Sequence, residues 1–186
     1  MSSTGTPHRD AARTPPRYSA ASRRLHWLMA VLVVLAYILI TSRSWFERGS
    51  DPRLFVVQGH FWVGIAVFAL VLPRLLARFA NPTPAIVPPL APLTHLASRI
   101  THVALYAFLL LQPALGMLVV FLERGGIPLG GLMLPSPFEL NPHLAHRIED
   151  LHITVGTAFY YVIALHVAAA LWHHFARRDN VLKRMI

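Results

Sequence analysis

The sequence contains no cysteine, few acidic residues and four long stretches without a single charge. The absence of cysteine excludes disulfides, iron–sulfur clusters, thiolate zinc sites and covalently attached c-type haem. Only 13% of the 186 residues are charged, whereas a soluble domain has about a quarter. Because 55% of the residues are apolar and the mean hydropathy is +0.50, an ordinary water-soluble globule is excluded as well.

The charge that is present is strongly basic. Lysine and arginine number 17 against 8 aspartates and glutamates, which gives a formal net charge of +9. A nucleic-acid partner would require a soluble, charge-rich surface to display these residues. This composition offers no such surface, so we predict no nucleic-acid binding and a membrane lipid environment instead.

The four charge-free stretches predict four membrane spans, each close to the roughly 20 apolar residues that cross the hydrocarbon core. They are residues 25–42, 54–73, 100–122 and 151–176. Their continuous apolar character is typical of helices and not of the alternating strands of a barrel. We therefore expect an all-α integral membrane four-helix bundle formed by residues 18–186 as a single domain. Residues 1–17 are expected to form a flexible basic N-terminal tail.

The connections between the spans carry basic residues unevenly. The N-terminal tail, the second connection and the C-terminal segment together hold 12 of the 17 basic residues and 2 of the 8 acidic residues. The 12 are Arg9, Arg13, Arg17, Arg23, Arg24, Arg74, Arg78, Arg99, Arg177, Arg178, Lys183 and Arg184. The positive-inside rule then places both termini in the cytoplasm, where the excess charge faces anionic headgroups.

Four histidines in the spans are the main candidates for a functional site, because an ionisable side chain inside a membrane is costly. His152 and His166 are fourteen residues apart, which on a helix means about 21 Å along the axis and directions within about 40°. On the other spans, His60 lies toward the outer side and His26 toward the inner side. Two imidazole pairs at different depths are what two six-coordinate haems require.

Small residues follow these four histidines at a spacing of four. Gly64 follows His60 and Gly156 follows His152, while Ala30 and Ala170 follow the other two. A flat macrocycle can approach a helix closely only beside a small side chain, so the spacing favours haem binding. Glycines at this spacing also promote plain helix packing, and that alternative stays open.

Further polar residues have two interpretations each. His102 is either a supporting or spare residue of the inner pair, or a hydrogen-bonding residue between helices. His173 is either a proton-exchange residue for a quinone, because histidine titrates near neutral pH, or a surface residue beside Arg177. Arg23 and Arg24 either extend to the lipid interface or pair with haem propionates.

The sequence argues against one other functional class and leaves a second one open. The spans contain no aspartate, glutamate, lysine or arginine, which argues against a proton or ion transporter. A histidine-based metal transporter or storage protein remains a rival interpretation, and it would show no haem absorption band.

Four sequence segments carry a resemblance to a known family. They are RLHW (24–27), PRLLARFANPTP (73–84), HVALY (102–106) and LHVAAALWHHFARRDNVLKRM (165–185). With these segments the chain resembles the bacterial cytochrome b561 family of small di-haem, four-helix membrane cytochromes. The resemblance extends from Tyr18 to Met185.

The resemblance implies a multi-pass protein of the bacterial inner membrane with two haem b groups. His26 and His166 would bind the inner haem iron, and His60 and His152 the outer one. It also implies an oxidoreductase in which ubiquinone is the expected substrate and the external donor is superoxide or a redox protein. The alternative is a membrane-anchor cytochrome subunit that carries electrons between quinone and a soluble dehydrogenase or hydrogenase. The oligomeric state is not defined by these patterns.

Overall fold

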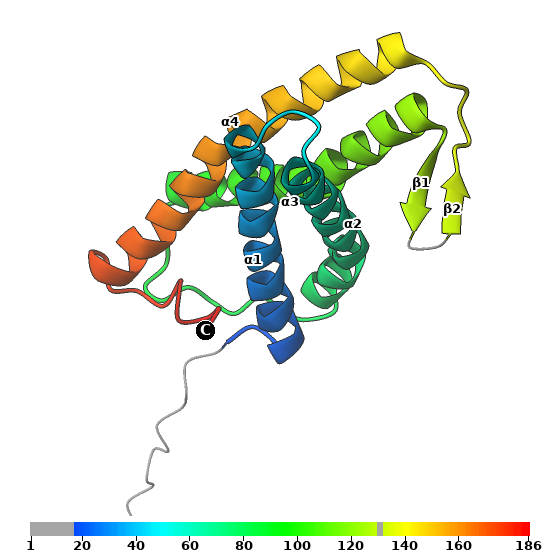
Figure 1. Cartoon of the computed structure of the whole chain (residues 1–186). Coiled ribbons are helices and arrows are strands. Elements are labelled where there is room, and N and C mark those ends of the chain that lie inside the picture. Colours follow the sequence, from blue (N-terminus) through cyan, green and yellow to red (C-terminus); the bar gives the residue numbers. More distant parts are fainter. Residues whose placement is uncertain (1–16, 130–131) are drawn as a thin grey trace, which may run out of the picture.

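Four long helices dominate the computed structural model, which describes residues 17–129 and 132–186 (Figure 1). The helices are α1 (Ala20–Ser42), α2 (Asp51–Phe79), α3 (Pro92–Arg124) and α4 (Pro142–Phe175). All four are long and apolar enough to cross a membrane. The predicted all-α membrane bundle is thereby confirmed. The predicted flexible tail lies almost entirely in residues 1–16, outside the described part of the chain.

The helices begin where the sequence supplies capping residues. The Ser19 side chain accepts a hydrogen bond from the Ser22 amide at the start of α1, and Asn141 accepts one from Leu144 at the start of α4. Helices α2, α3 and α4 each carry proline in the first turn, where its missing N–H is not needed. Helix α3 ends at Gly125, whose φ of 72° is the left-handed conformation that favours glycine.

All four helices begin before the charge-free stretches that predicted them, α3 and α4 by the most. Helix α3 begins at Pro92 and α4 at Pro142, so each starts eight or nine residues before its predicted span. The added turns carry charges such as Arg99, Glu149 and Asp150. A charge-free stretch therefore marks where a helix crosses the hydrocarbon and not where it starts, because a helix can continue beyond the lipid.

The remaining elements are short. A 3-10 turn, η1 (Arg43–Trp45), follows α1, and strands β1 (Gly126–Leu129) and β2 (Leu132–Pro135) form an antiparallel hairpin between α3 and α4. The hairpin projects from the end of the bundle where α3 ends and α4 begins (Figure 1).

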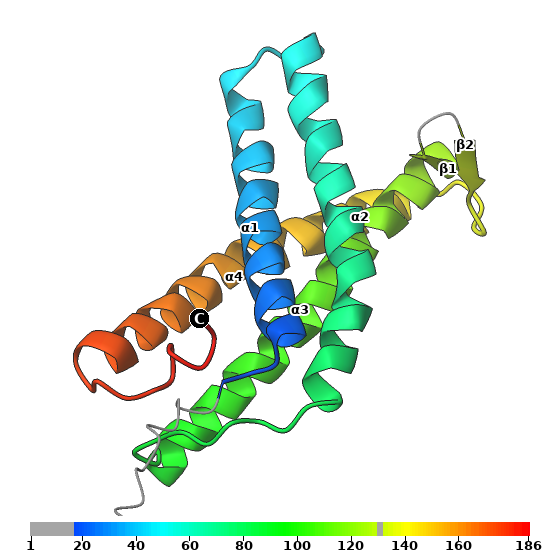
Figure 2. The same ribbon diagram turned by 90° about the horizontal axis from the view of Figure 1, so that it is seen from below.

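The helices are arranged as two antiparallel hairpins. Helix α1 packs on α2, α3 packs on α4, and α2 also contacts α3. Figure 2 shows the α1–α2 hairpin crossing the α3–α4 hairpin. A small buried core of Met29, Val67 and Val71 joins α1 to α2, and Leu109 of α3 packs against it. Large apolar side chains elsewhere are exposed, as expected for helices that face lipid.

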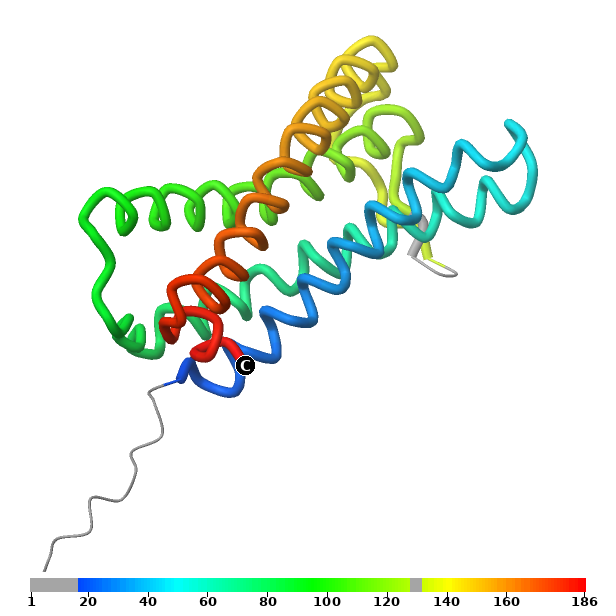
Figure 3. Tube along the Cα trace, turned by 90° about the vertical axis from the view of Figure 1, so that its left-hand side faces the viewer, coloured from blue at the N-terminus to red at the C-terminus, as the bar shows by residue number. Residues whose placement is uncertain are grey.

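The segment after α4, residues 177–186, lies against the start of α1 (Figure 3). We call this segment the C-terminal strap, and we call this end of the bundle the terminal end; the opposite end, with η1 and the β hairpin, is the loop end. The Asn180 amide accepts from the Val87 amide at 2.9 Å and donates to the Ala85 carbonyl at 3.1 Å. The Trp27 indole of α1 donates to the Met185 carbonyl at 2.8 Å. The strap thus ties the non-helical linker between α2 and α3 to helix α1.

Arg184, a buried residue of the strap, holds the strap against the linker. Its guanidinium is buried, donates to the Pro84 carbonyl and lies 5.5 Å from the centre of the Tyr18 ring. Burial lowers the pKa of Arg184 from its ordinary value because it penalises the charged form.

Candidate functional site

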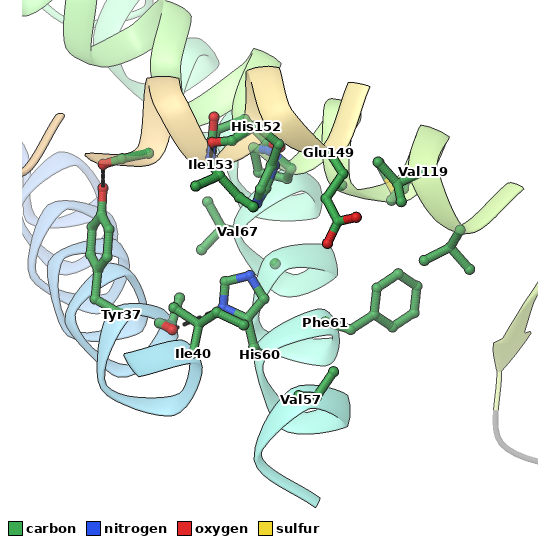
Figure 4. Close-up of a pocket in the computed structure, with 18 of the residues that line it drawn as sticks. Tyr37, Ile40, Val57, His60, Phe61, Val67, Val119, Glu149, His152 and Ile153 are labelled. Atoms are coloured by element: carbon green, nitrogen blue, oxygen red, sulfur yellow. Dashed lines mark hydrogen bonds between the residues drawn. The ribbon is translucent and has the colours of Figure 1, made fainter. Parts of the chain in front are cut away.

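A cavity of about 620 Å³ lies between the two helix hairpins, toward the loop end. Its lining comes from all four helices and is mostly apolar, with His60 of α2 and His152 of α4 among the lining residues. These two side chains point toward one another from facing helices (Figure 4). Their ring centroids are 6.2 Å apart and the ring planes are at 87°.

Both imidazoles are oriented by a backbone carbonyl of the neighbouring helix. Nδ1 of His60 lies 2.8 Å from the Ala36 carbonyl oxygen of α1, and Nδ1 of His152 lies 3.1 Å from the Gln112 carbonyl oxygen of α3. Because a carbonyl only accepts, each Nδ1 carries the proton and each Nε2 has a lone pair to offer. This arrangement is typical of metal-binding histidines, whose other ring nitrogen donates to a carbonyl or carboxylate.

The pair meets the geometric requirements of a haem. Two imidazoles on opposite sides of one iron, each bonded at about 2 Å, have ring centres about 6 Å apart. The cavity volume falls within the range of roughly 300–1,000 Å³ found for ligand and cofactor sites. Within residues 17–129 and 132–186, no three histidine, cysteine, aspartate or glutamate side chains converge to hold a bare ion. A porphyrin needs only two axial ligands from the protein, so the residues fit haem.

The two glycines predicted to make room for a haem differ in their surroundings. Both line the cavity. At Gly64 a Cβ atom would meet nothing within 4 Å, whereas at Gly156 it would come within 2.9 Å of the Gln112 side-chain nitrogen. Gly64 thus borders open space beside His60, and Gly156 permits close packing of α4 on α3.

Gln112 holds His152 by two contacts. Its carbonyl oxygen faces the imidazole as described above, and its side-chain Nε2 donates to the His152 carbonyl at 2.7 Å. The Oε1 atom is buried and has no hydrogen-bond partner among the described residues. Sequence reasoning missed this residue, although a glutamine within an apolar span was a visible signal.

A second group of histidines lies toward the terminal end. The rings of His102 and His166 are 5.5 Å apart with planes at 89°. His26 of α1 lies at the same end of the bundle, beside Arg74 of α2. The rings that contact each other at this end are thus those of His102 and His166, whereas the sequence predicted His26 and His166 as the inner pair. Nδ1 of His102 donates to the Ser98 carbonyl of its own helix at 2.6 Å, a local bond and not one between helices.

Arg74 of α2 reaches into this group. Its NH2 nitrogen donates to Nδ1 of His26 at 3.1 Å and its NH1 nitrogen donates to the Ser22 carbonyl at 3.1 Å. His26 consequently lacks the Nδ1–carbonyl arrangement seen at His60 and His152. The position of Arg74 just beyond the second span indicates only an extension toward the lipid interface; in the structure the side chain is half-buried against α1.

Arg23 and Arg24 lie in the first turns of α1, and their pairing with haem propionates stays a prediction. Arg23 donates to the Ile186 carbonyl oxygen of the C-terminal strap at 2.6 Å, and Arg24 is exposed. In this position Arg23 fastens the strap to α1.

His173, the residue expected to exchange protons, has a buried acidic partner. Its Nδ1 lies 2.5 Å from the Asp179 carboxylate, whose side chain is fully buried. The other carboxylate oxygen accepts from the Val181 amide, and Arg177 lies 3.7 Å away. Asp179 was missed by sequence reasoning. The available signal was the scarcity of acidic residues: the three segments predicted to be cytoplasmic contain only Asp10 and Asp179.

Comparison with known proteins yields a consistent set of relatives. A family model described as prokaryotic cytochrome b561 matches residues 17–186. A "Probable superoxide oxidase CybB" of Yersinia pestis is 31% identical over 91% of this chain and 96% of its own. "Cytochrome b561 homolog 1" of Escherichia coli K12 is 32% identical over 91% of this chain and 97% of its own. "Cytochrome b562" of Cereibacter sphaeroides is 29% identical over 92% of this chain and 96% of its own.

Proposed function

Because the chain belongs to the prokaryotic cytochrome b561 family, we propose that it carries electrons across the membrane between an external donor and the quinone pool. The family makes it a multi-pass bacterial membrane protein, a b-type cytochrome and an oxidoreductase. The proposal adds two haem b groups, ubiquinone as the inner substrate, and cytoplasmic termini.

The outer haem is assigned to His60 and His152. The single observation that carries the proposal is this facing pair, with rings 6.2 Å apart across the cavity and with both Nδ1 atoms bonded to carbonyls. Each histidine is fixed by the partner helix within its own hairpin. Gly64 leaves the space beside His60 open for the macrocycle.

The inner haem is assigned to His26 and His166. They come from α1 and α4, one from each hairpin, and Ala30 and Ala170 stand one turn further along the two helices. His102 supports His166 through the contact between their rings. Along α4, the fourteen residues between His152 and His166 correspond to about 21 Å.

When bound, haem supplies a reversible one-electron couple that the apolar side chains of this bundle cannot provide. Quinone chemistry also needs protons, and we assign their exchange to His173. Asp179 accepts from Nδ1 of His173, so Nε2 is the atom that takes up or releases the proton. The buried carboxylate holds the ring in this orientation.

Superoxide is the donor that we propose. The support is the 31% identity to a protein named probable superoxide oxidase. Arg43 and Arg124 line the cavity toward the loop end, but Glu123 and Glu149 line it too. Local charge therefore adds nothing to the choice of an anionic donor.

The first experiment is a reduced-minus-oxidised spectrum with haem quantification on the purified protein. Two b haems per chain are expected, and none would refute the proposal. His60→Ala and His152→Ala should each lower the content to one haem. His146→Ala, an exposed histidine on α4, is the matched control and should retain two.

Donor and acceptor are then separated by stopped-flow mixing. Superoxide and ubiquinol, mixed separately with the oxidised protein, should each reduce the haems. Reduction by ubiquinol alone would remove superoxide as donor. Co-purification of a soluble dehydrogenase or hydrogenase would instead favour a membrane-anchor subunit.

A further inference from the structure

We call His26, His102 and His166 the inner histidine group. Arg74 contacts His26 of this group, and both of its hydrogen bonds go to neutral atoms. Its donors go to the Ser22 carbonyl and to Nδ1 of His26, both at 3.1 Å. Its guanidinium carbon lies 5.6 Å from the centre of the Tyr106 ring of α3. The side chain is half-buried between three helices.

Such a charge needs an anion nearby. Arginine stays protonated in proteins, and a charge removed from water is costly unless an opposite charge pairs with it. In the described part of the chain, no carboxylate lies within 4.0 Å of Arg74. Arg78, one turn further along α2, adds charge of the same sign.

The other charges at the terminal end do not compensate Arg74. Among the described residues, Asp179 is the acidic side chain of this end, and His173, the Val181 amide and Arg177 already contact its carboxylate. Glu47, Asp51, Glu123, Glu139, Glu149 and Asp150 belong to the loop end. The described residues therefore orient the Arg74 side chain but place no opposite charge beside it.

We propose that Arg74 binds an anionic oxygen of a ligand at the inner histidine group. This inference rests on the proposed function. The shared chemistry is a negatively charged oxygen, and it has two sources: the propionate carboxylate of the inner haem, or the ionised hydroxyl of a quinol. Charge-assisted hydrogen bonds to such an oxygen are stronger than those to a neutral carbonyl or ring nitrogen.

The surroundings of Arg74 suit this role. The Ser22 carbonyl fixes one edge of the guanidinium and the Tyr106 ring lies close enough for a cation–π contact, which restricts how the group can turn. The other edge of the guanidinium donates to Nδ1 of His26. An anionic oxygen at that edge would form a stronger hydrogen bond. The anion would then lie beside His26, one of the residues assigned to the inner haem.

The test compares Arg74→Gln, which removes the charge and keeps a polar side chain, with the wild type. Arg78→Gln is the matched control, because it removes one positive charge from the same helix one turn away. Three properties are measured on each purified protein: haem content, the midpoint potential of each haem without quinone, and KM and kcat for ubiquinol.

A propionate ligand predicts that Arg74→Gln loses one haem per chain, or that the midpoint potential of one haem falls while the other is unchanged. A quinol ligand predicts unchanged haems and a KM for ubiquinol raised at least tenfold, with a smaller change in kcat. Wild-type values for haem content, both potentials and KM would overturn the proposal. An equal effect of Arg78→Gln would overturn it too, because the effect would then be one of general charge.

If Arg74→Gln does not accumulate in the membrane, Arg74→Lys provides the test. Lysine keeps the charge on one nitrogen and lacks the planar fork that would hold the Ser22 carbonyl and an anionic oxygen together, so a smaller shift in the same property is expected. A lysine variant identical to the wild type in all three properties would overturn the proposal. Failure of the proposed function is a separate result, since it requires a wild-type protein without two haems.

Discussion

At the scale of the residue, the same imidazole group has three different environments in this protein. His60 and His152 donate to backbone carbonyls, His173 faces a buried carboxylate, and His26 accepts from a guanidinium. A carbonyl leaves Nε2 ready to bind a metal, whereas a carboxylate stabilises a protonated ring. The partner atom of Nδ1 thus differs from one of these histidines to the next.

Asp179→Asn tests the carboxylate environment. The substitution removes the negative charge that faces Nδ1 of His173, so ubiquinol-driven haem reduction should slow by roughly tenfold to a hundredfold. Reduction by dithionite, which needs no protein-bound proton carrier, should be unchanged. Stopped-flow absorbance at the haem band measures both rates.

Arg177→Gln is the control for this variant, because it removes a more distant and partly exposed partner of the same carboxylate. It should keep the ubiquinol rate within a factor of about two. An Asp179→Asn protein with wild-type ubiquinol kinetics would show that His173 is a structural residue.

At the scale of the element, the connections hold the helix hairpins in place. The linker between α2 and α3 is rich in proline and non-helical, so it cannot position itself through its own backbone bonds. The C-terminal strap supplies those bonds from residues more than 90 positions away, through Asn180 and Arg184. The strap is thus part of the terminal end of the bundle.

Asn180→Ala should lower the stability of this arrangement. The substitution removes two hydrogen bonds to the linker, each contributing about 1 kcal/mol. The unfolding temperature in detergent should fall by roughly 4–8 °C, as followed by circular dichroism at a fixed haem load. Lys183→Ala, at an exposed position of the same strap, should leave it within a degree or so. Equal unfolding temperatures for the two variants would contradict this role of the strap.

At the scale of the whole molecule, charge distribution sets the orientation in the membrane. The N-terminal tail, the second connection and the C-terminal segment carry 12 basic and 2 acidic residues, and the first and third connections carry 5 and 6. The resulting net charges are +10 and −1. By the positive-inside rule we expect the first group in the cytoplasm, and in the proposed function this orientation decides which haem faces the external donor.

The absence of cysteine makes this orientation easy to test. Single cysteines are introduced at Lys183 in the strap and at Glu139 near the β hairpin, both exposed positions. A membrane-impermeant maleimide should label Glu139→Cys, and not Lys183→Cys, in intact spheroplasts. In inverted vesicles the maleimide should label Lys183→Cys and not Glu139→Cys. Labelling of Lys183→Cys in intact spheroplasts would show that the membrane orientation is opposite to the one proposed.

The sequence by itself determined the four spans and the depth of their histidines. A span is recognisable because the hydrocarbon core demands about 20 consecutive residues without charge, and this demand is local in the chain. The fourteen-residue spacing of His152 and His166 fixes their separation on one helix for the same reason. The meeting of His60 and His152 therefore follows from their matching depths on two spans.

Only the tertiary structure decided which atoms these side chains meet. Gln112 faces His152 across 40 residues of sequence, Arg74 faces His26 across 48, and Trp27 reaches Met185 across 158. These partners depend on how each helix is rotated and how the two hairpins cross, and no local pattern specifies either. For this reason the sequence located the histidines but not their contacts with Arg74, Gln112 and Asp179.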